Sequence, residues 1–121
     1  MSPNLLKNIM VFHFSMTTEE FKSLFDKEIM PAISSMREAG QREYAQDLDE
    51  IFANFNRIAN LLDCDRKQVL MTYMLKHIDG ISAHVKGHTS QREDVTGRIT
   101  DCIVYLMLLW GMIKEERGNN D

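Results

Sequence analysis

The chain has 121 residues, of which 44% are hydrophobic and 26% charged, and its formal net charge is −4. These values predict one small globular domain and exclude wholesale disorder. The acidic balance excludes binding to nucleic acid by phosphate neutralisation, which needs a basic surface. No run approaches the roughly 18 apolar residues of a membrane span, and residues 5–14 make a poor signal peptide. We therefore expect a cytoplasmic protein without a membrane partner, and its two cysteines suit that reducing compartment.

The first two predicted helices cover about residues 17–39 and 42–62. Thr17 to Glu20 forms a capping box, Pro31 should kink or restart the helix, and Gly40 should stop it. In the second helix, apolar residues recur every three or four positions, which is typical of an amphipathic helix. These residues are Ala45, Leu48, Phe52, Phe55, Ala59 and Leu62.

The third and fourth predicted helices cover about residues 66–86 and 91–116. Asp65 and Ser90 begin further capping boxes, and Gly87 ends the third helix. The predicted core stripe of the third helix is Leu70, Met74, Ile78, Ile81 and Val85. The predicted primary face of the fourth is Val95, Ile99, Cys102, Leu106, Trp110 and Ile113.

Four helices with short connections predict an all-α protein, arranged as an antiparallel four-helix bundle. We place the bundle domain at residues 17–116, between an N-terminal extension at 1–16 and a frayed tail at 117–121. The fourth helix is apolar on nearly all sides from Cys102 to Ile113, so that half must be covered all round. A second protomer is the expected cover, in a homodimer or homotetramer.

Polar residues border the apolar face of the second predicted helix. Asp47, Glu50 and Asn54 fall at positions i, i+3 and i+7 and share a narrow strip of that helix. One interpretation is a solvated flank with ordinary ion pairs. The other is a set of oxygen ligands turned into the bundle, where a hard cation such as Mg²⁺ binds.

Asp101 is the most informative residue, because it comes immediately before the all-round apolar half of the fourth helix. A carboxylate that enters a dry bundle must be paired or must coordinate a metal. The alternatives are an internal ion pair, for instance with Arg98, and metal ligation. Glu93 likewise has two interpretations, as the capping-box partner of Ser90 or as a ligand.

The third predicted helix carries Lys76, His77 and Asp79. His77 borders the apolar stripe, so a half-buried histidine with a hydrogen bond is the default interpretation. A zinc site of His77 with His84 and His88 is disfavoured by the two-turn spacing and by the helix stop that precedes His88. Lys76 and Asp79 form either a surface pair or a phosphate-binding lysine beside a carboxylate.

Several segments resemble small tailed-phage proteins of the "nucleotide modification associated domain" type and, more distantly, MazG-like all-α nucleotide pyrophosphohydrolases. The segments are Tyr44–Asp47, Phe52–Phe55, Lys76–Asp79 and Ser90–Leu109, within a similarity over residues 44–112. Asp101, in the pattern Asp-x-x-x-Tyr-Leu, resembles the last metal-binding aspartate of the MazG-like pattern. The chain departs from that pattern at two places. Asp47–Glu50 is its nearest counterpart to the Glu-Glu-x-x-Glu of the pattern, and Arg98 replaces a glutamate of the pattern.

The resemblance implies a Mg²⁺-dependent nucleotide phosphohydrolase or nucleotide-binding protein of phage nucleotide metabolism, in the host cytoplasm. The expected metal ligands are Asp47, Glu50, Glu93 and Asp101; the catalytic carboxylates Glu50 and Asp79; and the substrate-binding residues Lys76, His77, Arg98 and Asn54. The departures favour an alternative, a non-catalytic phage module. Such a module would sequester a nucleotide or inhibit a host defence protein by direct binding.

Overall fold

The structure is a computed structural model that describes residues 15–45, 49–88 and 92–118. These residues form helices and turns and include no strand, so the prediction of an all-α protein is confirmed for them. The chain divides at Pro31 into two compact units, residues 1–31 and 32–121, which are considered separately. The predicted boundaries at residues 16 and 117 stay predictions.

The first unit contains α2 (Thr18–Leu24) and η1 (Phe25–Ile29), a π-helical turn. Thr17 is the N-cap, as predicted, and its hydroxyl accepts a 3.1 Å hydrogen bond from the backbone N–H of Glu20. The interruption expected at Pro31 takes the form of η1, where the Met30 N–H donates to the carbonyl of Phe25 five residues earlier. No residue of α2 or η1 is buried.

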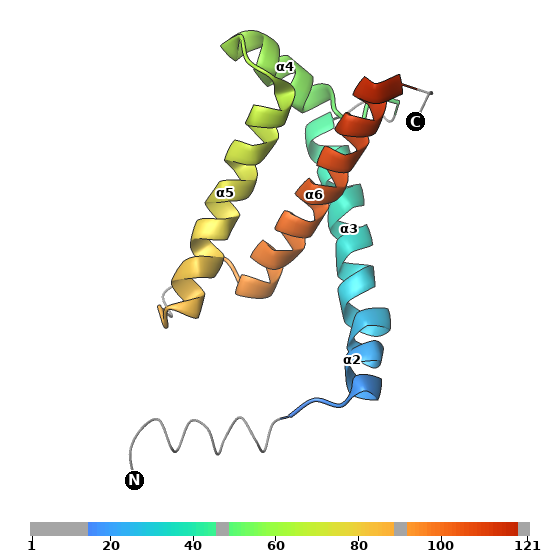
Figure 1. The fold of residues 1–121 in the computed structure, drawn as a ribbon, viewed down its shortest axis with the longest axis vertical. Coiled ribbons are helices and arrows are strands. Elements are labelled where there is room, and N and C mark those ends of the chain that lie inside the picture. Colours follow the sequence, from blue (N-terminus) through green and yellow to red (C-terminus); the bar gives the residue numbers. More distant parts are fainter. Residues whose placement is uncertain (1–14, 46–48, 89–91, 119–121) are drawn as a thin grey trace. The chain divides into compact units, whose positions relative to one another are not determined.

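The helices that follow η1 lead into the second unit (Figure 1). They are α3 (Met30–Gly40), the π-helical turn η2 (Gln41–Ala45), α4 (Ala53–Leu62), α5 (Arg66–Val85) and α6 (Val95–Arg117). The predicted stop at Gly40 is wrong, because the helix continues into η2. Gly40 has no positive φ, and the Arg37 side chain donates to Gln41 across it at 3.1 Å.

The prediction of one continuous helix over residues 42–62 is wrong. Residues 42–45 are helical as part of η2, but residues 49–52 form a turn, and α4 begins only after Phe52. The buried Phe52 ring centre lies 5.2 Å from the guanidinium carbon of Arg66, and a Cβ on Gly111 would meet this ring at 3.0 Å. Packing of one ring onto α5 and α6 therefore overrides the helical periodicity around it. Asp47 and Leu48 lie outside the described residues.

Helix α5 begins and ends as the sequence predicts. Asp65 accepts a hydrogen bond from the Lys67 N–H at 2.8 Å, and the Gln68 side chain accepts one from the Asp65 N–H at 3.3 Å. At the other end, Gly87 has φ +96° and the His88 N–H donates to the Ala83 carbonyl at 3.1 Å. This is a Schellman motif, whose left-handed position favours glycine.

Helix α6 starts later than predicted. Its N-cap is Asp94, whose carboxylate accepts from the Thr96 N–H at 3.1 Å. Glu93 therefore precedes the cap and does not occupy the third helical position that a capping box with Ser90 requires. Ser90 itself lies outside the described residues.

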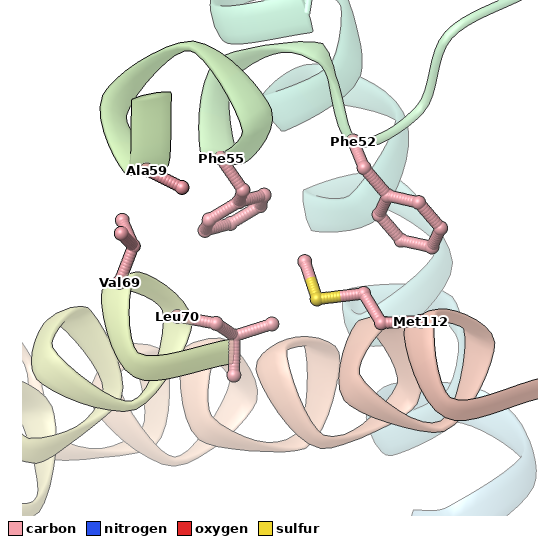
Figure 2. Close-up of a cluster of buried hydrophobic side chains, with 6 residues drawn as sticks. All are labelled: Phe52, Phe55, Ala59, Val69, Leu70 and Met112. Carbon is pink, nitrogen blue, oxygen red and sulfur yellow. The ribbon is translucent and has the colours of Figure 1, made fainter. Parts of the chain in front are cut away.

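Six buried side chains form the core of the second unit (Figure 2). They are Phe52, Phe55, Ala59, Val69, Leu70 and Met112. Leu70 of α5 and Met112 of α6 are fully buried, and α4 contributes Phe55 and Ala59 above them. The two long helices α5 and α6 run antiparallel, since the start of α5 pairs with the end of α6 through Lys67 and Glu116 at 2.7 Å.

The predicted core stripes of α5 and α6 are correct only in part. In α5, Leu70 and Met74 are buried, whereas Ile78 is 40% exposed and His77 takes the inward position. In α6, the buried residues are Val104 and Met112. No residue of the predicted primary face is buried: three are half-buried, and Ile99, Leu106 and Trp110 are exposed. The sequence shows two apolar faces on α6, and packing within the chain uses the less regular one.

Among the described residues, one helix is long and apolar enough to cross a membrane by length and composition. It is α6, whose most apolar 18 residues have a mean hydropathy of 1.3. A core helix of a soluble protein passes the same test, and α6 packs one face on α5. The prediction of a cytoplasmic protein without a membrane partner stays a prediction.

Candidate functional site

The candidate site joins one histidine and two carboxylates from separate elements. His77 lies on α5, Asp101 lies on α6, and Glu93 lies just before α6. His77 Nδ1 is 3.5 Å from Asp101 Oδ2 and 3.8 Å from Glu93 Oε2. One donor atom from each of the three side chains lies within 4.8 Å of the others. The antiparallel packing of α5 on α6 thus brings these distant residues together.

The imidazole of His77 is buried at this position. The residue is 9% exposed, and its Nδ1 atom has no hydrogen-bond partner. The distances to the two carboxylates exceed the 2.7–3.2 Å typical of an N–H···O hydrogen bond. A buried nitrogen without a hydrogen bond is costly, so this atom indicates a position where a further group belongs.

Burial controls the charge of Asp101, whose side chain is 28% exposed. Burial raises the pKa of this carboxyl above its ordinary value, and the neighbouring Glu93 carboxylate raises it further. Positive charge at Arg98, and at His77 when it is protonated, acts in the opposite direction. A cation placed beside Asp101 would stabilise its charged form.

A hollow of about 510 Å³ lies beside these three residues. Its wall combines the histidine and the carboxylates with basic, amide and phenol groups. The lining residues are Asn54, Arg57, Ile58, Tyr73, Lys76, His77, Glu93, Asp101 and Tyr105. The side chains of Arg57 and Lys76 are exposed and give this wall two positive charges.

A second hollow of about 260 Å³ borders the first. Asn54, Asp101 and Tyr105 line both hollows. The second one is more apolar, and its other walls include Ile51 and Leu108. Arg37 and Glu43 also line it, so Asp101 lies between two hollows of which the second is the more apolar.

Arg98 takes a position that the sequence does not predict. Its side chain lies on Gly80 of α5, where a Cβ would meet Nη1 of Arg98 at 2.5 Å. Its Nε atom is buried without a hydrogen-bond partner. The partner within ion-pair distance of Asp101 is His77 and not Arg98. Of the two alternatives weighed for Asp101, the ion pair with Arg98 is therefore not the observed arrangement.

The three grouped side chains are donors that divalent metals accept. Two donors at about 2.0–2.2 Å from one ion lie about 3–3.5 Å apart, close to the observed separations. Carboxylates suit Mg²⁺ and Mn²⁺, whereas imidazole suits Zn²⁺ and Fe²⁺. A mixed set of one imidazole and two carboxylates thus fits Mn²⁺ or Zn²⁺ better than Mg²⁺.

The structure brings together five of the residues predicted for the site. They are Asn54, Lys76, His77, Glu93 and Asp101, all of which line the polar hollow. Arg98 acts on Asp101 through its charge and does not line the hollow. Glu50 and Asp79 line neither hollow, and Asp47 lies outside the described residues. Glu50 and Asn54 do not share the predicted strip of one helix, because α4 begins after Glu50.

Sequence reasoning missed Tyr73 and Arg57 as walls of the hollow. Both had a signal in the sequence. Tyr73 precedes His77 by four residues and so shares its helical face, and Arg57 follows Asn54 by three.

Comparisons of the chain with protein-family models, with curated proteins and with solved structures found no match. The resemblance to MazG-like and phage proteins therefore stays a prediction.

Proposed function

We propose that the chain binds a divalent cation at His77, Glu93 and Asp101, and through it the phosphate groups of a nucleotide. The observation that carries this proposal is the buried Nδ1 atom of His77, which has no hydrogen bond and faces two carboxylates. A cation would satisfy this nitrogen and offset the two negative charges at once.

The walls of the polar hollow support a phosphorylated ligand. Lys76 and Arg57 supply positive charge, and arginine forms paired hydrogen bonds with phosphate oxygens. Asn54 offers an amide at the border of the apolar hollow, which suits the sugar or base of a nucleotide. The sequence assigned the phosphate contact to Lys76 and Arg98, and Arg57 is the better second candidate because it lines the hollow.

Hydrolysis of the nucleotide is a second candidate function, and the carboxylates that line the polar hollow favour it. Asp101 and Glu93 would act in hydrolysis by holding the cation, in place of Glu50 and Asp79, which line neither hollow. A cation at this site would orient water and offset phosphate charge.

The bundle arrangement and the biological setting remain part of this proposal. Helices α5 and α6 run antiparallel, and in this proposal α4 and the helical segment from α3 to η2 complete a four-helix bundle with them. A role in phage nucleotide metabolism in a host cytoplasm rests on the sequence resemblance alone.

Calorimetric titration of the full chain with Mn²⁺, Zn²⁺ and Mg²⁺ tests the cation site directly. We expect binding of Mn²⁺ or Zn²⁺ to the parent chain and its loss in His77→Asn. His84→Asn is the matched control, since His84 is an exposed histidine on the same helix and lines neither hollow. Equal binding by both variants would reject the site.

A panel of (d)NTPs with the preferred cation then separates binding from hydrolysis. Turnover that Asp101→Asn abolishes supports the phosphohydrolase. Binding without turnover supports the non-catalytic module expected as the alternative. Cation binding without nucleotide binding would remove the nucleotide from the proposal.

A further inference from the structure

An exposed apolar surface covers one side of α5 and α6, and it is separate from the cation site. We name it the back face, and it consists of Met71, Leu75, Ile78 and Val85 on α5 with Ile99, Leu106 and Trp110 on α6. Trp110 is 76% exposed and Val85 is 78% exposed.

Helical geometry places the two halves of the back face on the same side. At about 100° per residue, the α6 half lies opposite Val104 and Met112, which are buried toward the core. The α5 half likewise points away from Val69 and Tyr73, which face α4. Because α5 and α6 pack side by side, the two halves form one continuous surface turned away from α4.

The spacing of the back face is that of a helix-packing seam. On α6, the apolar positions are 99, 103, 106, 110 and 113, with alternating steps of four and three. On α5, the positions 71, 75, 78, 82 and 85 repeat the same steps, with Ser82 the one polar member. This 3.5-residue period is the pattern by which antiparallel or parallel helices interlock. Packing within the chain leaves most members of the two seams exposed, and Ile103 and Ile113 are half-buried.

The size of the back face matches one side of a stable dimer. Its seven members expose on the order of 700 Å² per chain, which approaches the roughly 800 Å² that each partner contributes to a standard interface. Soluble monomers rarely expose apolar patches larger than a few hundred Å². A shallow hollow beside Trp110, lined also by Leu106 and Ile113, leaves room for a side chain of the partner.

We infer that the occupant of the back face is a second copy of this chain. A two-fold axis would place α5 and α6 of one copy against α5 and α6 of the other. The interface would then consist of two layers, each with two helices from one copy. A bilayer is the less suitable occupant, because the inner face of α6 carries Arg98 and Asp101 and both would accompany a spanning helix. In each copy, the cation site would then lie on the side of α5 and α6 that faces α4, away from the dimer interface.

The oligomeric state of the full chain tests this inference. We expect sedimentation equilibrium to give twice the chain mass, and Trp110→Glu to give a monomer with unchanged helix content. Leu61→Glu is the matched control, because Leu61 is 78% exposed and lies on α4, away from the back face. A monomeric parent, or a Trp110→Glu variant that stays dimeric, would overturn the inference.

Tryptophan fluorescence gives a second measurement that needs no variant. Trp110 is the one tryptophan of the chain. We expect short-wavelength emission at micromolar concentration and a red shift on dilution, as the dimer dissociates. Emission at long wavelength at every concentration would contradict a covered Trp110. A blue shift that requires anionic lipid vesicles would assign the back face to a membrane and reject the second copy.

Discussion

Replacing Asp101 by asparagine should stabilise the metal-free chain at neutral pH and weaken its response to a cation. Burial raises the pKa of Asp101, so folding favours the protonated carboxyl over the charged one. The stability that this group contributes is present below the ordinary carboxyl pKa, and it is lost as pH rises through the raised pKa. At pH 7 the charged Asp101 therefore lowers the free energy of unfolding, and the uncharged, isosteric asparagine removes that cost.

The effect on the cation response can be estimated from the size of the chain. Unfolding entropy of about 2.1 cal/mol/K per residue makes 1 kcal/mol correspond to about 4 °C of melting temperature for a chain of this length. A cation at 100 times its Kd adds about 2.7 kcal/mol, which is about 10 °C. Asp101→Asn removes one of three ligands and should remove most of this shift.

Thermal unfolding of both proteins, with EDTA and with a Mn²⁺ series, measures the two effects separately. Asp79→Asn is the control, since Asp79 is an exposed carboxylate on α5 that lines neither hollow. The stabilisation of Asp101→Asn in EDTA should shrink as pH falls toward 4. The reasoning fails if Asp101→Asn is less stable than the parent in EDTA at pH 7, or if Mn²⁺ stabilises both equally.

Two further predictions concern packing between α5 and α6. Gly97→Ala should raise the free energy of unfolding by about 0.5 kcal/mol, because nothing lies near the added Cβ. Gly80→Ala should give no gain, because its Cβ displaces the Arg98 side chain. Equal shifts in melting temperature for the two variants would contradict the close contact between Gly80 and Arg98. The pKa of the Cys102 thiol is raised by burial and by the Asp101 carboxylate, so Cys102 should react with a thiol reagent more slowly than the exposed Cys64 at pH 8. In the unfolded chain the two thiols should react at equal rates. Equal reaction rates of Cys102 and Cys64 in the folded chain would contradict the burial of Cys102.

Local signals in the sequence predicted the helix ends that depend on neighbouring residues. The caps at Thr17 and Asp65 and the stop at Gly87 involve side chains and backbone groups within a few positions, so spacing alone identifies them. The cap of α6 was misplaced by four residues because Ser90 and Asp94 both offer a capping side chain. A single sequence holds no information that ranks two such candidates.

Contacts between distant residues decided the features that the sequence did not predict. The turn before α4 exists because the Phe52 ring reaches Arg66 and Gly111, which are 14 and 59 positions away. Periodicity had placed this residue on a continuous helix, and nothing within the segment 42–62 indicates the break. The strip of oxygen ligands predicted around Glu50 depended on that helix and failed with it.

Prediction of the site succeeded for residues whose position follows from helix packing. Asp101 was identified because a carboxylate at the start of an apolar stretch is costly without a partner. In the structure the neighbouring partner is His77, whose Nδ1 atom lies 3.5 Å from Asp101 Oδ2. The role of His77 was the harder one to predict. The residue alone predicts an ordinary half-buried histidine, and the resemblance implies a substrate contact. Only the packing of α5 on α6 shows that its Nδ1 atom faces two carboxylates.

The composition of α6 follows from its position between two surfaces. One face, with Val104 and Met112, packs against the core of the chain, and Asp101 lies on that same side. The opposite face, with Ile99 and Trp110, carries the regular seam of the back face. A helix that serves only the core of one chain needs a single apolar stripe, so the second stripe indicates a second contact. The two faces also separate the two proposals, because a substitution at Trp110 leaves every ligand of the cation site in place.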